Sequence, residues 1–437
     1  MSISSDVAQR SEQSVKTAKT GLIIIIVSTI FLAAIYTCFF SNKKIPDSEI
    51  AEETESGKSD NDISQSTSSE QLSAFEAVNA MSIGWNLGNT LDSIDNQKRG
   101  VSGEFNEKTP EEFYETYWGN PITTAAMINK IVQAGFGAIR IPVTYADHMD
   151  DNFQIRPEWL ERVKQVVDYV LDNDVYCIIN IHHDTGSGTW PWLNADADNI
   201  GVLGKQFESV WKQIAEYFKE YDDKLLFESF NEILDRDSNW SKSDRTSYSA
   251  VNQLNQIFVD TVRSIGGNNS DRLLVIKSYS ASVDKDVLNS FSLPMDSVKG
   301  RLIFSFHYYG TQEFILNQEQ AEWADTYANW DYGKDGKPVE LTMMRVRAQF
   351  PDIPVIIGEF GAQSKGNTAD RVMYATHFIE TARKYGITCF WWDTGGWFEN
   401  ADAVDNYALF DRYRNQWFFP EIVEAMVDTA NNFEQSH

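Results

Sequence analysis

From about residue 72 to about residue 430, the chain alternates short apolar runs with longer stretches of helical periodicity. The apolar runs have the length of strands and lie at 83–88, 138–143, 175–181, 225–230, 272–277, 301–306, 354–358 and 387–392. The helical stretches between or after them include 157–172, 202–220, 246–265, 368–385 and 421–430. Apolar strands alternating with helices are typical of a parallel sheet covered by helices, and eight of them predict a (β/α)8 TIM barrel. A doubly wound open sheet is the alternative, weakened because no GxGxxG motif follows the first run.

The N-terminal part of the chain has a different pattern. Residues 21–40 (GLIIIIVSTIFLAAIYTCFF) carry no charge, and a helix of that length reaches about 30 Å, the thickness of a bilayer core. This predicts a transmembrane signal anchor after a cytoplasmic tail at 1–20. A cleaved signal peptide is the alternative, although the run is long and no A-x-A site follows it. The flanking basic residues favour a cytoplasmic N-terminus. We therefore expect a membrane-anchored protein at the cell surface, or a secreted one if residues 1–40 are cleaved.

Residues 41–71 are rich in serine and acidic residues, which predicts a disordered linker before one globular domain at 72–437. The formal net charge of −27 disfavours a polyanionic partner, so we expect no nucleic-acid binding. The 13 tryptophans indicate either an open cleft for flat, hydroxylated ligands or a large core. No cysteine or histidine spacing suggests a metal site, and we expect no cofactor.

Polar residues gather where the predicted strands end, which in a barrel is the face that carries the chemistry. Four of the six histidines lie at such positions. In chain order, the candidate site residues are Asn89, Arg140, His148, His182, His183, Asn231, Glu232, His307, Tyr309, Glu359 and Trp392. The pair Asp147/His148 is weaker evidence, since a solvated Asp147 on a surface loop is as good an interpretation as a binding role for it.

Two of these candidates are carboxylates, Glu232 after the fourth strand and Glu359 after the seventh. Those strands lie nearly opposite each other in an eight-stranded barrel, so the two side chains can meet across its mouth. Glycoside hydrolysis needs such a pair, one to protonate the leaving oxygen and one to attack or stabilise the anomeric centre. At a separation of about 5–5.5 Å the second carboxylate acts as the nucleophile. The alternative is that each glutamate forms a structural ion pair.

The neighbouring residues have roles that fit this chemistry. Arg140 near Glu359 would keep that carboxylate ionised, and Tyr309 could orient it through a hydrogen bond. The negative charge on Glu359 would raise the pKa of Glu232 and keep it protonated. His307 could line the cleft near either carboxylate.

The remaining candidates could contact the sugar itself. Asn231 could donate to the 2-hydroxyl. We expect His182 and His183 to point to opposite faces of a strand, which suits hydrogen bonding to sugar better than chelation of a metal.

Aromatic side chains could supply stacking surfaces for sugar rings. Trp392 ends the last strand and could stack on a sugar, with core packing as the alternative, and core packing is the better interpretation for its neighbour Trp391. Trp190 and Trp192 could form an outer platform or pack within their loop.

With these residues placed, the chain resembles glycoside hydrolase family 5, most closely its subfamily 4 endoglucanases. The matching stretches follow the order of the family: GWNLGNTLD (84–92), IRIPVTY (139–145), INIHHD (179–184), FESFNE (227–232), FSFHYYG (304–310), VIIGEFG (355–361) and WWDTG (391–395). The resemblance implies a retaining mechanism with Glu232 as acid/base and Glu359 as nucleophile. It implies supporting roles for Arg140, His182, Asn231, His307, Tyr309 and Trp392.

The resemblance also implies β-1,4-glucan substrates, namely cellulose, mixed-linkage glucan and xyloglucan, and sometimes xylan. Two positions depart from the family pattern: Ile233 stands where proline often follows the acid/base, and Tyr145 stands where tryptophan usually follows the second strand. We therefore expect a membrane-tethered endo-β-1,4-glucanase. The alternatives are a mannanase or xylanase on the same barrel and a non-catalytic carbohydrate-binding barrel.

Overall fold

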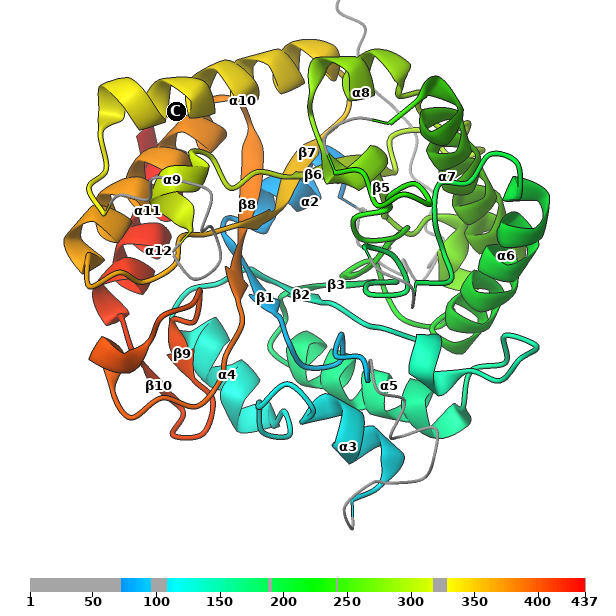
Figure 1. The fold of residues 1–437 in the computed structure, drawn as a ribbon, viewed down its shortest axis with the longest axis horizontal. Coiled ribbons are helices and arrows are strands. Elements are labelled where there is room, and N and C mark those ends of the chain that lie inside the picture. The colour runs from blue at the N-terminus through cyan, green and yellow to red at the C-terminus, as the bar shows by residue number, and fades with distance from the viewer. Residues whose placement is uncertain (1–71, 96–107, 188–190, 241–242, 317–327, 437) are drawn as a thin grey trace, which may run out of the picture. The chain divides into compact units, whose positions relative to one another are not determined.

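The computed structural model describes residues 72–95, 108–187, 191–240, 243–316 and 328–436 (Figure 1). At its centre, eight parallel strands form a closed barrel in chain order, with β8 paired to β1. This confirms the predicted (β/α)8 barrel, and the pairing of β8 with β1 rules out the open sheet. The strands are β1 (Gly84–Leu87), β2 (Ala138–Ile141), β3 (Tyr176–Asn180), β4 (Leu225–Glu228), β5 (Leu274–Lys277), β6 (Leu302–His307), β7 (Val355–Phe360) and β8 (Ile387–Asp393).

Helices surround the barrel, as Figure 1 shows. The five predicted helical stretches correspond to α5 (Pro157–Leu171), α6 (Ile200–Tyr217), α7 (Arg245–Ile265), α11 (Thr368–Lys384) and α12 (Pro420–Ser436). The structure adds shorter or less regularly patterned elements: α2 (Ala74–Ala80), α3 (Pro110–Glu115), α4 (Ala125–Gln133), α8 (Lys285–Ser290), α9 (Gln312–Ile315), α10 (Lys337–Gln349) and an antiparallel pair, β9 (Phe410–Asp411) and β10 (Gln416–Trp417).

Local sequence signals explain where these helices begin and which face they bury. Pro157 opens α5, where its missing N–H costs no hydrogen bond. The buried residues of α5 recur every three or four positions, so one apolar stripe faces the barrel. Asp244 caps α7 by accepting hydrogen bonds from the N–H groups of Thr246 and Ser247.

The amino-terminal end of the barrel interior is an apolar floor. The helix α2 carries a capping box between Ser73 and Glu76 and packs beneath the strands through Val78, together with Met81, the residue that follows the helix. The strand residues that complete this floor are all apolar or aromatic: Ala138, Tyr176, Ile178, Leu226, Leu273, Val275, Ile303, Ile356 and Phe390. The helix therefore closes the end of the barrel opposite to the predicted site.

The carboxyl-terminal end of the same interior is polar. Two positions beyond the last floor residue, each of the strands β2 to β6 places a buried polar side chain: Arg140, Asn180, Glu228, Lys277 and Ser305. Asn86 on β1 and His307 at the end of β6 are buried polar residues as well. Because residues two apart on a strand point to the same face, each of the strands β2 to β6 contributes to both layers. The interior thus changes from apolar to polar and charged side chains within two residues along these strands.

A bulge in β7 turns Glu359 toward this polar end. In the pairing with β6, Ile357 matches Phe306 while Glu359 already matches His307, so β7 holds one extra residue at Gly358. The pairing with β8 shows the same shift between Ile357 and Phe360. Without the bulge, alternation would direct Glu359 outward with Ile357. A Cβ atom on Gly358 would lie 2.8 Å from the Ser305 hydroxyl, so any larger residue there would displace the Ser305 side chain.

The predicted tail (1–20), signal anchor (21–40) and linker (41–71) lie outside the described residues, and their boundaries stay predictions. Among the helices that the structure describes, none combines the length and the apolar character that crossing a bilayer requires.

Candidate active site

Glu232 and Glu359 meet at the mouth of the barrel. Glu232 lies in the loop just beyond β4, and Glu359 lies in β7. One carboxylate oxygen of each, together with a ring nitrogen of His307, lie within 4.8 Å of one another. The Glu359 side chain is 6% exposed and the Glu232 side chain 22% exposed. Their environments therefore differ although they share one site.

Glu359 is held by two donors, as the sequence predicts. Arg140 donates through Nη1 to Oε1 at 2.8 Å, and the Tyr309 hydroxyl donates to Oε2 at 2.9 Å. Burial raises the pKa of Glu359, and the cations of Arg140 and Lys277 oppose that rise. Burial and the negative charge of Glu359 raise the pKa of Tyr309 well above its ordinary value, so the phenol keeps its proton and donates. These bonds make Glu359 the carboxylate that ionises first.

Glu232 is the member of the pair that retains its proton. Burial, and next the charge on Glu359, raise its pKa to about 8. Its Oε1 lies 2.7 Å from Nδ1 of His307, and the same nitrogen lies 3.4 Å from Oε2 of Glu359. His307 therefore sits between the two carboxylates and contacts the acid more closely.

A buried network of hydrogen bonds centred on Glu228 lies next to the residues that hold Glu359. Glu228 was not among the site residues predicted from the sequence. Glu228 accepts from Arg140 at 2.6 Å, from Asn180 at 2.8 Å and from Lys277 at 3.0 Å. Burial alone would raise the pKa of Glu228, but Arg140 and Lys277 hold it below its ordinary value. The signal was present in the sequence, because glutamate and lysine are rare inside apolar strands unless they are paired.

Asn86 belongs to the same network and holds the bulge in place. Its Nδ2 donates to the carbonyl of Gly358 at 2.9 Å, and its Oδ1 accepts from Arg140 at 2.9 Å. It thereby connects the β7 bulge to the guanidinium that binds Glu359.

Asn231 lies beside Glu232 and also contacts Arg140. Its Oδ1 accepts from Nη2 of Arg140 at 2.9 Å, and its main-chain N–H donates to the carbonyl of Ile181. Because the oxygen of the side chain is occupied, its NH₂ group is the donor left for a ligand.

The structure corrects the expectation that His182 and His183 point to opposite faces. The strand β3 ends at Asn180, so both histidines lie in the following loop, where alternation no longer applies. Their ring centroids are 4.5 Å apart. His182 also lies parallel to Trp392, with centroids 5.7 Å apart, so the two rings line the same side of the mouth.

These two histidines and Asp92 lie close enough together to be considered as ligands of a metal ion. Asp92, His182 and His183 offer ligand atoms within 4.8 Å of one another. However, Nδ1 of His183 lies 2.7 Å from the main-chain carbonyl of Asp92, which can only accept, so this nitrogen carries a proton. The Asp92 carboxylate accepts from the N–H groups of Asn89 and Thr90. The arrangement fits a hydrogen-bonded turn better than a coordination shell.

Two candidates make their hydrogen bonds to residues other than the carboxylate pair. Asn89 adopts the left-handed conformation, and its main chain forms hydrogen bonds with the side chains of Asp92 and Asn120, which hold the turn after β1. His148 is fully buried, stacks on Trp159 with centroids 3.5 Å apart, and contacts Arg156. The short turn at Ala146–His148 directs it toward α5 instead of the mouth.

Some tryptophans pack in the core or within their own loop, whereas others line the cleft beside Glu232. Trp391 is buried in the core, as predicted, and Trp192 donates to the Asp184 carboxylate within its loop, while Trp190 lies outside the described residues. The cleft beside Glu232 has a volume of about 210 Å³ and is walled by Trp118 and Trp240, which the sequence analysis did not single out. Both come from loops, whose position at the cleft depends on the tertiary fold.

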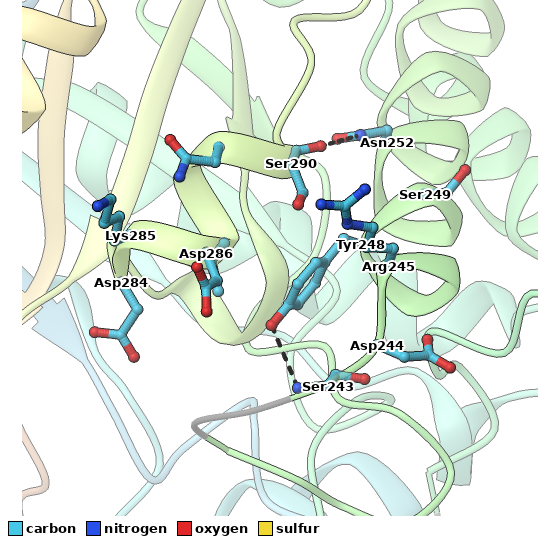
Figure 2. Close-up of a pocket in the computed structure, with 12 residues that line it drawn as sticks. Ser243, Asp244, Arg245, Tyr248, Ser249, Asn252, Asp284, Lys285, Asp286 and Ser290 are labelled. Atoms are coloured by element: carbon cyan, nitrogen blue, oxygen red, sulfur yellow. Dashed lines mark hydrogen bonds between the residues drawn. The ribbon is translucent and has the colours of Figure 1, made fainter.

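A larger hollow, of about 1060 Å³, lies between α7 and α8 (Figure 2). Figure 2 shows Asp244, Tyr248 and Asp286 among the polar side chains that line it. None of the predicted site residues lines this hollow. The paired carboxylates, and not the size of a cavity, therefore identify the candidate active site.

A closed (β/α)8 barrel with two carboxyl groups of unequal acidity at its mouth defines a class, the barrel glycoside hydrolases. The family model described as Cellulase (glycosyl hydrolase family 5) matches residues 100–396. The chain belongs to this family, which confirms the resemblance inferred from the sequence motifs.

Known relatives agree with this assignment. Endoglucanase A of Clostridium longisporum is 37% identical over 363 residues, covering 82% of this chain and 66% of that protein. Endoglucanase A of Ruminococcus albus is 36% identical over 376 residues, covering 84% of this chain and 96% of that protein.

Solved structures show the same fold. A GH5-4 broad specificity endoglucanase from Clostridium longisporum matches with a TM-score of 0.74 and 33% identity, covering 83% of this chain and 99% of that one. A xyloglucan-specific endo-β-1,4-glucanase from a metagenomic library, in complex with cellotriose, matches with a TM-score of 0.71 and 34% identity, covering 81% and 98%.

Proposed function

We propose that this protein is a retaining endo-β-1,4-glucanase that hydrolyses cellulose, mixed-linkage β-glucan and xyloglucan. The observation that carries the proposal is the pair Glu232 and Glu359, with carboxylate oxygens within 4.8 Å and unequal hydrogen-bond partners. Carboxyl groups of retaining enzymes lie about 5–5.5 Å apart, whereas inverting enzymes need about 6.5–9.5 Å to admit a water.

In the first step, a carboxylate oxygen of Glu359 bonds to the anomeric carbon while the glycosidic C–O bond breaks. Glu232 gives its proton to the leaving oxygen, which its raised pKa allows at neutral pH. In the second step, the ionised Glu232 takes a proton from water, the water oxygen bonds to the anomeric carbon, and the ester to Glu359 breaks.

Other side chains bind and orient the sugar. The NH₂ group of Asn231 donates to the 2-hydroxyl, a bond that strengthens in the transition state. Trp392, which lies parallel to His182, stacks on the ring bound next to the nucleophile. His183 and the tryptophans of the cleft bind neighbouring sugars.

The test is hydrolysis by the full-length chain of carboxymethylcellulose, mixed-linkage glucan, xyloglucan, mannan and xylan, followed by reducing ends and by viscosity. We expect activity on the three β-glucans and a fall in viscosity ahead of sugar release, as endo cleavage requires. Glu359→Ala should lose about 10⁴-fold or more in kcat, as removal of a nucleophile does. The control is Glu340→Ala, which removes a surface carboxylate on α10 that pairs with Lys384 of α11.

Equal activity of Glu359→Ala and the unmodified chain would reject the assigned nucleophile. Activity confined to mannan or xylan would favour the alternative substrates. Binding without any hydrolysis would favour the non-catalytic barrel.

The proposal includes a location. The uncharged run at 21–40 anchors the enzyme in the membrane, and the acidic linker at 41–71 holds the catalytic domain outside the cell, where its polymeric substrates are. In cell fractionation, the full-length chain should stay with membranes in high salt and leave them in detergent. Recovery of the enzyme in the medium without residues 1–40 would instead indicate a cleaved signal.

A further inference from the structure

The last residue of β5, Lys277, is buried without a role in the mechanism above. Its side chain is 0% exposed and lies behind His307, on the side away from Glu232. Burying an ammonium group costs several kcal/mol unless it is paired. Its Nζ lies 3.0 Å from Oε1 of Glu228 and 2.7 Å from Nε2 of His307.

Pairing with Glu228 does not by itself explain why a lysine is buried at position 277. Arg140 already donates to both oxygens of Glu228 through Nε, at 3.1 and 3.2 Å, and to Oε1 through Nη2 at 2.6 Å, and Asn180 donates to Oε1 at 2.8 Å. The contact that other residues do not duplicate is the one between Lys277 and the imidazole of His307.

Several charged groups face Lys277 from the surrounding strands. Glu228 on β4 and His307 on β6 touch it, while Arg140 on β2 and Glu359 on β7 act at longer range. Burial lowers the pKa of Lys277 to about 8, and Glu228 opposes this effect. The ammonium form therefore predominates at neutral pH.

The ammonium fixes the tautomer of His307. Burial, and next the cations of Lys277 and Arg140, lower the pKa of His307 well below its ordinary value, so the ring is neutral and carries one proton. An ammonium only donates, so Nε2 accepts from Lys277 and the ring proton resides on Nδ1. Nδ1 then donates to Oε1 of Glu232 over 2.7 Å.

We propose that Lys277 is a positioning residue that, through the tautomer of His307, makes Glu232 carry its acidic proton on Oε2, facing the leaving oxygen. The inference rests on the proposed function, since it assigns Glu232 the role of the acid. With Oε1 engaged by the imidazole N–H, the free oxygen is the one that protonates the departing sugar. Lys277 thus acts on the acid step without touching the substrate.

The first test is the tautomer in the unmodified, full-length enzyme, read from the ¹⁵N chemical shifts of its six labelled histidines. The His307 signals are identified by their loss in His307→Gln. We expect Nδ1 protonated and Nε2 unprotonated. A proton on Nε2 of His307 would overturn the proposal without any lysine variant.

The second test compares two β-cellobiosides, one with a phenyl group and one with an activated 2,4-dinitrophenyl group, which leaves without an acid. Lys277→Met should lower kcat/KM about 10- to 100-fold for the phenyl substrate and less than about 3-fold for the activated one, because general acid catalysis is worth about 10²–10⁴-fold in full. The conservative variant Lys277→Gln, whose amide still donates, should recover part of the loss.

The matched control is Lys365→Met, which removes a half-buried lysine that donates to the carbonyls of Glu313 and Phe314. It should leave the ratio between the two substrates unchanged. Equal losses on both substrates in Lys277→Met would show a purely structural role and contradict the proposal. Failure of the unmodified enzyme to cleave either β-cellobioside would instead count against the proposed function.

Discussion

The two ends of the barrel interior follow the same strand alternation but carry opposite chemistry. At the floor, α2 and the strands bury residues such as Met81, Ile178 and Phe390, which need only fill space. At the mouth, the same strands bury Arg140, Glu228 and Lys277, which need partners of opposite charge. The floor can therefore be perturbed by changes in volume, whereas the mouth is perturbed by changes in charge.

Among variants of the mouth and the floor, and apart from loss of the nucleophile Glu359, we expect the largest fall in activity for Glu232→Ala. Loss of the general acid should lower kcat/KM about 10²–10⁴-fold on glucan or a phenyl β-cellobioside. The 2,4-dinitrophenyl substrate should be cleaved with little loss in the glycosylation step, because its leaving group needs no proton. Steady-state and burst kinetics on both substrates measure this difference, and equal losses would remove Glu232 from the acid role.

A pair of variants separates the mouth from the floor. Glu228→Gln should cost about 3–5 kcal/mol in the free energy of unfolding, since it leaves buried cations without their anion, and it should also reduce activity. Phe390→Ala should cost a similar amount, about 3–5 kcal/mol, through the cavity it creates. Because Phe390 lies in the floor, the folded variant should keep its kcat and pH profile.

Denaturant unfolding and kinetics at a temperature where both variants are folded measure these effects. If Phe390→Ala changed the pH profile as much as Glu228→Gln does, the two layers would not be independent.

The smallest expected change in kcat/KM is the one that pH produces in the unmodified enzyme. Glu232 must be protonated, and its pKa is raised to about 8, so kcat/KM should fall as the pH rises through about 8. Glu359 must be ionised, and burial raises its pKa, so the acid limb should lie above the pH of an ordinary glutamate, about 4.3. An alkaline limb near pH 5 would contradict the assignment of Glu232 as the buried acid.

The sequence predicted the fold and the carboxylate pair because each has a local signal. All eight strands are apolar runs, and Glu232 and Glu359 stand where two of those runs end. Their contacts with His307, Arg140 and Tyr309 follow from the closure of the barrel, which brings the strand ends together.

Other parts of the site required the tertiary structure. The bulge at Gly358, which turns Glu359 inward, appears only in the pairing of β7 with β6 and β8. Trp118 and Trp240 reach the cleft from loops, and His148 is turned away by a short helix that has no clear sequence pattern. Lys277 did have a signal in the sequence, because it is a charged residue at the end of an apolar strand-like run, the predicted strand 272–277.

The central claim is that Glu359 forms a covalent bond to the sugar while Glu232 supplies the proton. The most direct measurement is mass spectrometry of the full-length enzyme after incubation with an activated 2-deoxy-2-fluoro-β-cellobioside, followed by peptide mapping. The account predicts one fluorocellobiosyl group per chain, attached to Glu359. A label on Glu232, or an unlabelled enzyme that releases products of inverted configuration, would contradict it.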